Sequence, residues 1–115
     1  MIDVERARFE ELVAAALDAI PPDLARLIEN VVVLVEDWSD DPDLLGLYDG
    51  VPLTERADYG VGFAMPDRIV LFRKAICALC ETEDDVIDEV SVTVVHELAH
   101  HFGIDDDELE RLGWS

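Results

Sequence analysis

The first third of the chain carries an apolar pattern with helical spacing. Apolar side chains recur at intervals of three and four residues and so share one helix face: Phe9, Leu12, Val13, Ala16, Leu17 and Ile20. Asp3 can cap the start of this helix, and Pro21-Pro22 ends it because proline cannot continue a helix. Pro22 can also begin a second helix over Asp23–Glu29, since proline is favoured at the first helical position. The pattern therefore predicts two helices, the first with one core-facing stripe.

Three apolar runs predict strands. Val31–Val35 is a continuous run of valine and leucine and predicts a buried central strand. Arg68–Phe72 predicts a second strand, and Leu44–Tyr48 predicts a short third strand. An acidic turn over Asp37–Asp43 and a long loop over Pro52–Pro66 separate these runs.

The last third of the chain predicts a helix over Arg73–Cys80 and a long one over Glu83–Phe102, starting at Thr82 or Glu83. At about 100° per residue, apolar side chains cover roughly 200° of the long helix: Ile87, Val90, Val92, Val94, Val95, Leu98, Ala99 and Phe102. The remaining strip carries polar side chains: Glu89, Thr93, His96, Glu97 and His100. We therefore expect this helix to cross the middle of the domain with its polar strip facing a cleft.

The polar strip contains the motif H-E-x-x-H. His96 and His100 are four residues apart, so both imidazoles can reach one metal ion. Glu97 can take a proton from metal-activated water. Gly103 stands where the helix should stop, because glycine enters the left-handed region at little cost. Asp106 follows the turn and can supply a third ligand.

Two neighbouring aspartates after the turn suit different roles. Asp105 and Glu108 have the spacing of a capping box for a last helix over Asp106–Leu112. This leaves Asp106 for the metal, although spacing alone leaves the reverse assignment open. Two imidazoles and one carboxylate leave a fourth position for water, which is typical of catalytic Zn²⁺, one ion per chain. Such a site can polarise an amide carbonyl while Glu97 acts as general base and returns the proton to the leaving amine.

Other chemically distinctive side chains have simpler interpretations. His101 lies off the ligand face, and we interpret it as a surface histidine favoured by the helix C-terminus. Cys77 and Cys80 form a single C-x-x-C without a second pair, inside an apolar stretch, which favours burial as small hydrophobic residues. Trp38 and Trp114 are expected in core or rim packing.

Length and charge limit the possible partners. The 115 residues predict one domain over residues 1–115, and the 50% apolar content argues against disorder. A formal net charge of −20 disfavours nucleic acids and anionic membranes and favours cations or basic peptides. The acidic N-terminus lacks the pattern of a signal peptide, and no apolar run is long enough to span a membrane. We therefore expect a cytoplasmic location.

The site motif continues as H-E-x-x-H-x-x-G-x-x-D and resembles the aspzincin branch of the zincin metallopeptidases; the chain as a whole resembles the small bacterial mini-zincins. Further segments share the resemblance: residues 45–53, 66–72 and 112–114. The resemblance implies an α+β fold, with a small mixed β-sheet packed on the active-site helix and an edge strand over the cleft, for which Leu44–Tyr48 is the candidate. It also implies a zinc-dependent peptidase that takes a peptide or protein substrate as an added strand.

Two features leave alternatives open. Only about a dozen residues follow Gly103, so a partner protein can be needed to complete the cleft. Tyr48 and Tyr59 are candidates for stabilising the oxyanion, on residue type alone. A non-catalytic, metal-stabilised interaction module is the main rival, although an intact Glu97 and an open coordination position argue against it. A family of metal-dependent ribonucleases has a similar motif, but that motif has Gly at the position of Glu97 and His at the position of Asp106. Its RNA substrate also needs a basic protein surface.

Overall fold

The computed structural model describes residues 1–50 and 66–114 and contains the predicted mixture of helices and strands. The elements in chain order are α1 (Arg6–Asp18), α2 (Pro22–Ala25), the 3₁₀ helix η1 (Arg26–Ile28), β1 (Val31–Glu36), β2 (Gly46–Asp49), β3 (Asp67–Phe72), α4 (Arg73–Ala78), α5 (Glu83–Phe102) and α6 (Asp106–Arg111). The loop predicted over residues 52–66 lies almost entirely outside the described residues. Within the described ranges, no helix has the length and apolarity needed to cross a membrane.

The three strands form a mixed sheet in the order β1-β3-β2, with β1 parallel and β2 antiparallel to β3. The prediction of a central strand at Val31–Val35 was wrong, because β3 is central and β1 is an edge strand. Val32 and Leu34 on β1 are 40% and 38% exposed. A β-branched run indicates a strand, but it does not report which neighbours the strand will have. The edge position expected for the strand near Tyr48 is confirmed by β2.

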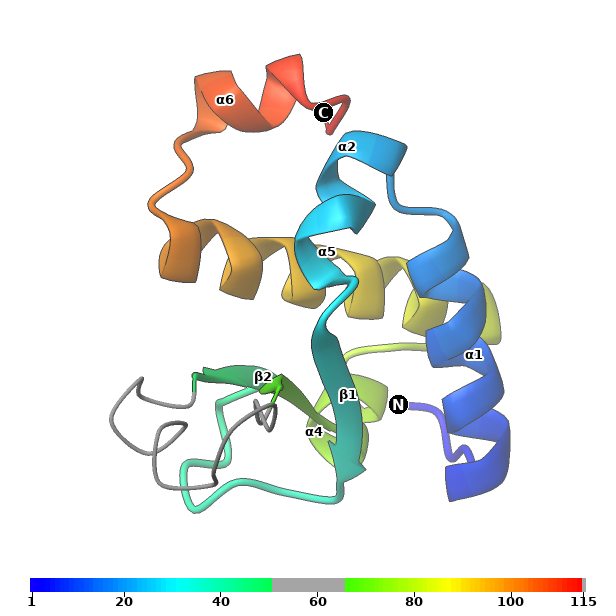
Figure 1. Ribbon diagram of the computed structural model, residues 1–115. Helices are drawn as coiled ribbons and strands as arrows, with labels where there is room; N and C mark the ends of the chain where they lie inside the picture. The colour runs from blue at the N-terminus through cyan, green and yellow to red at the C-terminus, as the bar shows by residue number, and fades with distance from the viewer. Residues whose placement is uncertain (51–65, 115) are drawn as a thin grey trace.

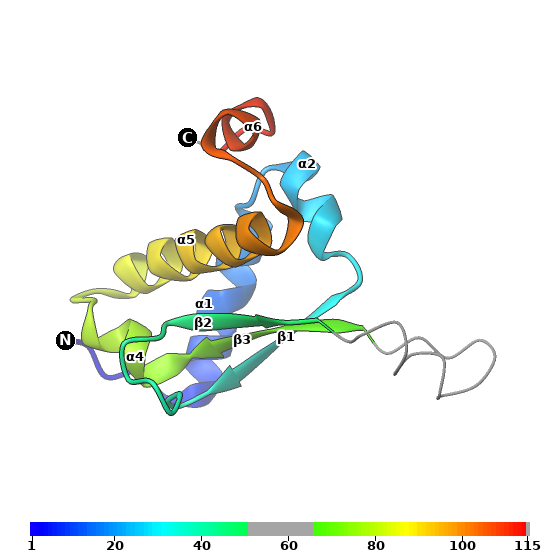
Figure 2. The ribbon, with the colours of Figure 1, turned by 90° about the vertical axis from the view of Figure 1, so that its left-hand side faces the viewer.

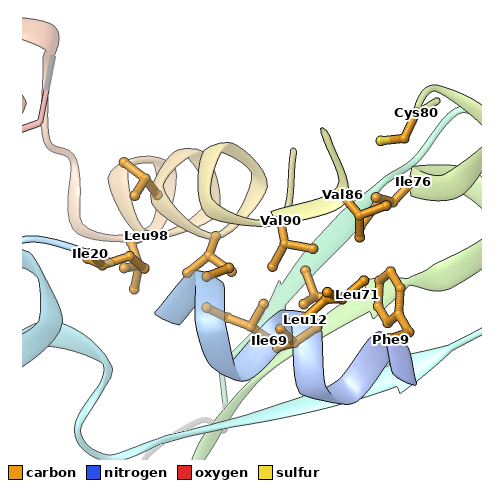
Figure 3. Packing of buried hydrophobic residues seen from close by; sticks show 14 of the residues in the cluster. Phe9, Leu12, Ile20, Ile69, Leu71, Ile76, Cys80, Val86, Val90 and Leu98 are labelled. Carbon is orange, nitrogen blue, oxygen red and sulfur yellow. The ribbon is translucent and has the colours of Figure 1, made fainter. Parts of the chain in front are cut away.

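The core lies between one face of the sheet and the helices α1 and α5. Phe9 and Leu12 of α1 meet Ile69 and Leu71 of β3 and the apolar face of α5 (Figure 3). Helix α5 runs between the sheet and α6, as the two perpendicular views show (Figures 1 and 2). The expected central position of α5 is therefore confirmed.

The helix starts differ in how well the sequence predicted them. The predicted cap at Asp3 was wrong: α1 begins after Glu5, and no side chain caps it. The segment before α1 is held instead by a backbone hydrogen bond, in which the Ile2 N–H donates to the Cys77 carbonyl at 3.1 Å. Thr82 is the N-cap of α5 in a reciprocal capping box with Asp85. The N–H groups of Glu81 and Thr82 donate to the Asp85 carboxylate and lower its pKa.

Helix α5 approaches the edge strand β2 very closely. A Cβ atom placed on Gly46 of β2 would lie 2.6 Å from Thr93 Cγ2 and 3.2 Å from the Val70 carbonyl oxygen. Thr93, which the helix arithmetic placed on the polar strip, is buried by this contact, with an exposed fraction of 7%. Glycine at position 46 therefore sets the distance between β2 and the helix that carries the candidate site.

Cys77 and Cys80 are buried free thiols, which confirms the interpretation from sequence. Both line the apolar core near the end of α4. Burial raises the pKa of both thiols, that of Cys80 to about 11. Neither is therefore suited to thiolate chemistry at neutral pH.

Alkylation kinetics test this burial. At pH 8 the Cys80 thiol, with its pKa of about 11, is ionised to only about one part in a thousand, far less than a free cysteine. We expect native Cys80 to react with iodoacetamide about a hundredfold more slowly than the denatured chain, and faster as the pH rises towards 11. Equal rates in native and denatured protein would contradict the buried placement.

Substitution of Gly46 tests the close contact between β2 and α5. We expect Gly46→Ala to lower the free energy of unfolding by about 1–3 kcal/mol, because the new methyl group overlaps the branched Thr93 side chain. Thr93→Ser removes the clashing methyl group and should recover part of that loss in the double variant. Chemical denaturation of wild type, the two single variants and the double variant measures the free energy of unfolding. If Gly46→Ala lowers this free energy equally with Thr93 and with Ser at position 93, the contact between Gly46 and Thr93 is not the cause.

Candidate metal and catalytic site

The polar strip of α5 presents its site residues in two directions. His96 and His100 are exposed, one helical turn apart, whereas Glu97 is half-buried. The helix ends as predicted at Gly103, which has φ of 64° and donates its N–H to the Ala99 carbonyl. The chain then leaves α5 and returns as α6 on the side of the helix away from the sheet (Figure 2).

Asp105 and Asp106 have the separate positions that their spacing predicted. Asp105 is the N-cap of α6, and its Oδ1 accepts a hydrogen bond from the Glu108 N–H at 2.9 Å. Asp106 is the first residue of the helix and is exposed. The cap assignment of Asp105 is therefore confirmed, and Asp106 is left free to line the space between α6 and α5.

That space is a cleft of about 420 Å³. It is lined by His96 from α5 and by Asp106, Leu109, Glu110 and Trp114. The Trp114 backbone N–H donates to the Leu109 carbonyl at 2.9 Å, which holds this residue beside α6. The sequence analysis did not assign Glu110 to the site, although it lies one helical turn after Asp106 and therefore on the same face of α6.

The chemistry of the predicted ligands fits zinc. Two imidazoles one turn apart and a nearby carboxylate form a donor set that Zn²⁺ prefers, and His96 and Asp106 already face one cleft. His100 is not among the residues that line this cleft. Across residues 1–50 and 66–114, no three His, Cys, Asp or Glu side chains are grouped closely enough to hold one ion. The three-ligand set therefore stays a prediction.

Glu97 faces the edge strand β2 rather than the cleft. Its Oε2 accepts a hydrogen bond from the Tyr48 N–H at 3.3 Å. The neighbouring ladder explains this direction, because the Phe72 N–H donates to the Leu45 carbonyl at 2.9 Å. The backbone polar groups of residues 45, 47 and 49 therefore face β3, and those of residues 46 and 48 point away from β3. The candidate general base therefore contacts the strand edge where an extended substrate could add.

The structure also places Tyr48, one of the two oxyanion candidates, and His101. The Tyr48 hydroxyl donates to Oδ2 of Asp67, the first residue of β3, at 2.7 Å. Tyr59, the other oxyanion candidate, lies outside the described residues. His101 is partly exposed in the last turn of α5, as expected, and its ring also stacks on the Tyr48 ring.

Comparison with known proteins agrees with this architecture. A family model described as zincin-like metallopeptidase matches residues 28–114, which include every predicted site residue. The solved structure of a conserved hypothetical protein from T. thermophilus is similar, with a TM-score of 0.54 and 24% sequence identity, over 86% of this chain and 94% of that one. This similarity supports the fold. No curated protein matches the chain significantly.

Substitution of three consecutive aspartates tests the ligand assignment. We expect Asp106→Ala to lose stoichiometric zinc and the zinc-dependent rise in Tm, because a ligand is removed. Asp105→Ala should lower stability by about 1 kcal/mol through loss of the cap but keep zinc. Asp107→Ala is the matched control and should change neither property. Metal content and Tm with and without zinc measure both effects, and zinc loss in Asp105→Ala but not in Asp106→Ala would reverse the two roles.

Proposed function

The chain belongs to the zincin-like metallopeptidase family, and from this premise we propose that it is a peptidase that binds one zinc ion per chain. The observation that carries the proposal is the position of Glu97. This carboxylate lies on the helix that presents His96 and His100, and it contacts the Tyr48 backbone N–H on the side of β2 away from β3. A general base, a pair of imidazole ligands and a strand edge thus meet at one end of α5.

Each residue has a definite role in this proposal. His96, His100 and Asp106 would hold the ion. When bound, zinc supplies Lewis-acid polarisation of the scissile carbonyl and lowers the pKa of water. Glu97 removes the proton from the attacking water and delivers it to the leaving amine, as a carboxylate within hydrogen-bond reach can do.

The surroundings of the site favour an extended, basic substrate. Gly46 of β2 directs its N–H and C=O groups away from β3, towards the side where an antiparallel strand would add. Asp106 and Glu110 line the adjacent cleft, and the whole chain carries a net charge of −20. We propose a cytoplasmic location. We also propose that a partner protein completes the cleft for larger substrates, because α6, which borders the cleft, has only six residues.

Removal of the general base tests the reaction. We expect Glu97→Gln to keep one zinc per chain while kcat falls by about 10²–10⁴-fold, because the amide cannot accept the proton. Asp88→Asn is the matched control: it is also an isosteric amide substitution on α5, at an exposed position away from the site. Zinc content and cleavage of a peptide library rich in Lys and Arg are measured for wild type and both variants.

The same experiment separates the peptidase from its main rival. Wild-type protein with one zinc per chain that cleaves no peptide in a broad library would favour the metal-stabilised interaction module. Glu97→Gln that retains wild-type turnover would remove Glu97 from the mechanism.

A further inference from the structure

Helix α5 carries two interleaved pairs of polar residues in its last turns. His96 and His100 form one pair, and Glu97 and His101 form the other, each with a spacing of four residues. Residues four apart share a helix face. Glu97 contacts β2 through the Tyr48 N–H, so His101 should reach the same strand one turn further along. The described contacts agree with this expectation.

His101 contacts the Tyr48 side chain directly. The imidazole and phenol rings are stacked, with centroids 3.9 Å apart and planes 15° from parallel. Phe102 meets both rings edge-on, 4.9 Å from the His101 centroid and 6.1 Å from that of Tyr48. One residue of β2 is therefore bound to α5 twice, by its N–H through Glu97 and by its ring through His101.

Asp67, the first residue of β3, ties this ring pair to the sheet. Its Oδ2 accepts the Tyr48 hydroxyl at 2.7 Å and lies 4.0 Å from His101 Nε2. The carboxylate is mostly buried, because its side chain is 18% exposed. A single carboxylate oxygen thus lies close to both rings, at the start of the central strand.

We propose that Tyr48, His101 and Asp67 form a clamp that orients Glu97. The clamp fixes the backbone of β2 against the last turns of α5, so that the Tyr48 N–H points at Glu97 Oε2 and leaves the other carboxylate oxygen for water. His101 and Asp67 act through Tyr48 and are positioning residues. This role in catalysis rests on the peptidase function proposed above, whereas the clamp itself is a property of the fold.

The clamp has a clear physical need. Within residues 1–50 and 66–114, β2 is a strand of four residues whose one neighbouring strand is β3. Short edge strands of this kind are weakly held. A hydrogen bond of 3.3 Å at an exposed edge competes with water and does not by itself hold the strand. The stacked rings and the Asp67 hydrogen bond add two further constraints at Tyr48, the residue that carries the N–H.

Amide hydrogen exchange at Tyr48 in the metal-free full-length protein tests the clamp. We expect His101→Ala to accelerate exchange of this amide by about tenfold, because the ring stack is lost. His101→Phe keeps a stacking ring and should stay within about threefold of wild type. Thr82→Ala is the control, since it weakens the same helix at its opposite end and should leave Tyr48 exchange unchanged relative to core amides. Glu97→Ala measures how much of the protection comes from the carboxylate.

The outcomes distinguish the clamp from a general effect on stability. If His101→Ala and Thr82→Ala change Tyr48 exchange equally, or if His101→Phe behaves like His101→Ala, the clamp is wrong. In the zinc-loaded enzyme, we expect His101→Ala to lower kcat by about tenfold with a smaller change in KM, and His101→Phe to restore most of it. If wild-type protein cleaves no peptide, the peptidase proposal fails while the exchange data still decide on the clamp.

Discussion

Burial of one side of α5 determines the direction of every side chain that this helix contributes to the candidate site. Val86, Val90 and Val94 are completely buried against α1 and the sheet. Full burial of such a side chain contributes about 1.5–3 kcal/mol. A rotation of the helix by one residue, about 100°, would expose these valines and push His96 and Glu97 towards the core. Packing thus fixes the orientation of α5 and, with it, the directions of the candidate site side chains.

The two sides of α5 are supported very differently. Glu97 faces a strand of the sheet and already has a backbone donor. The ligand side faces α6, a helix of six residues that joins α5 through the turn at Gly103 and relies on the Asp105 cap and the Trp114 backbone contact. Short elements with few buried contacts open at low free-energy cost. If the proposed ligands His96, His100 and Asp106 hold an ion, their closure around it would depend on adjustment of α6, whereas Glu97 is already held by β2.

The sequence predicted features whose causes are local. Thr82, Gly103 and Asp105 act through backbone groups within one turn, so their roles as caps follow from residue type and spacing. Features that depend on distant contacts were missed. The edge position of β1 follows from strand order, and the burial of Thr93 follows from the approach of Gly46. The hydrogen bond from the Tyr48 N–H to Glu97 could not be predicted either, because the sequence pattern of side chains does not show where a backbone N–H points.

The hydrogen bond between Glu97 and Tyr48 joins the proposed general base to the edge strand β2. In an antiparallel ladder, alternate residues of an edge strand offer their N–H groups outward. In β2 the outward residue nearest the histidine pair is Tyr48, whose N–H is donated to Glu97. In the proposed peptidase, the stack of Tyr48 on His101 and the Asp67 hydrogen bond would keep this N–H on Glu97. A substrate strand would then pair beside Tyr48, at the outward groups of Gly46, while the carboxylate stays oriented.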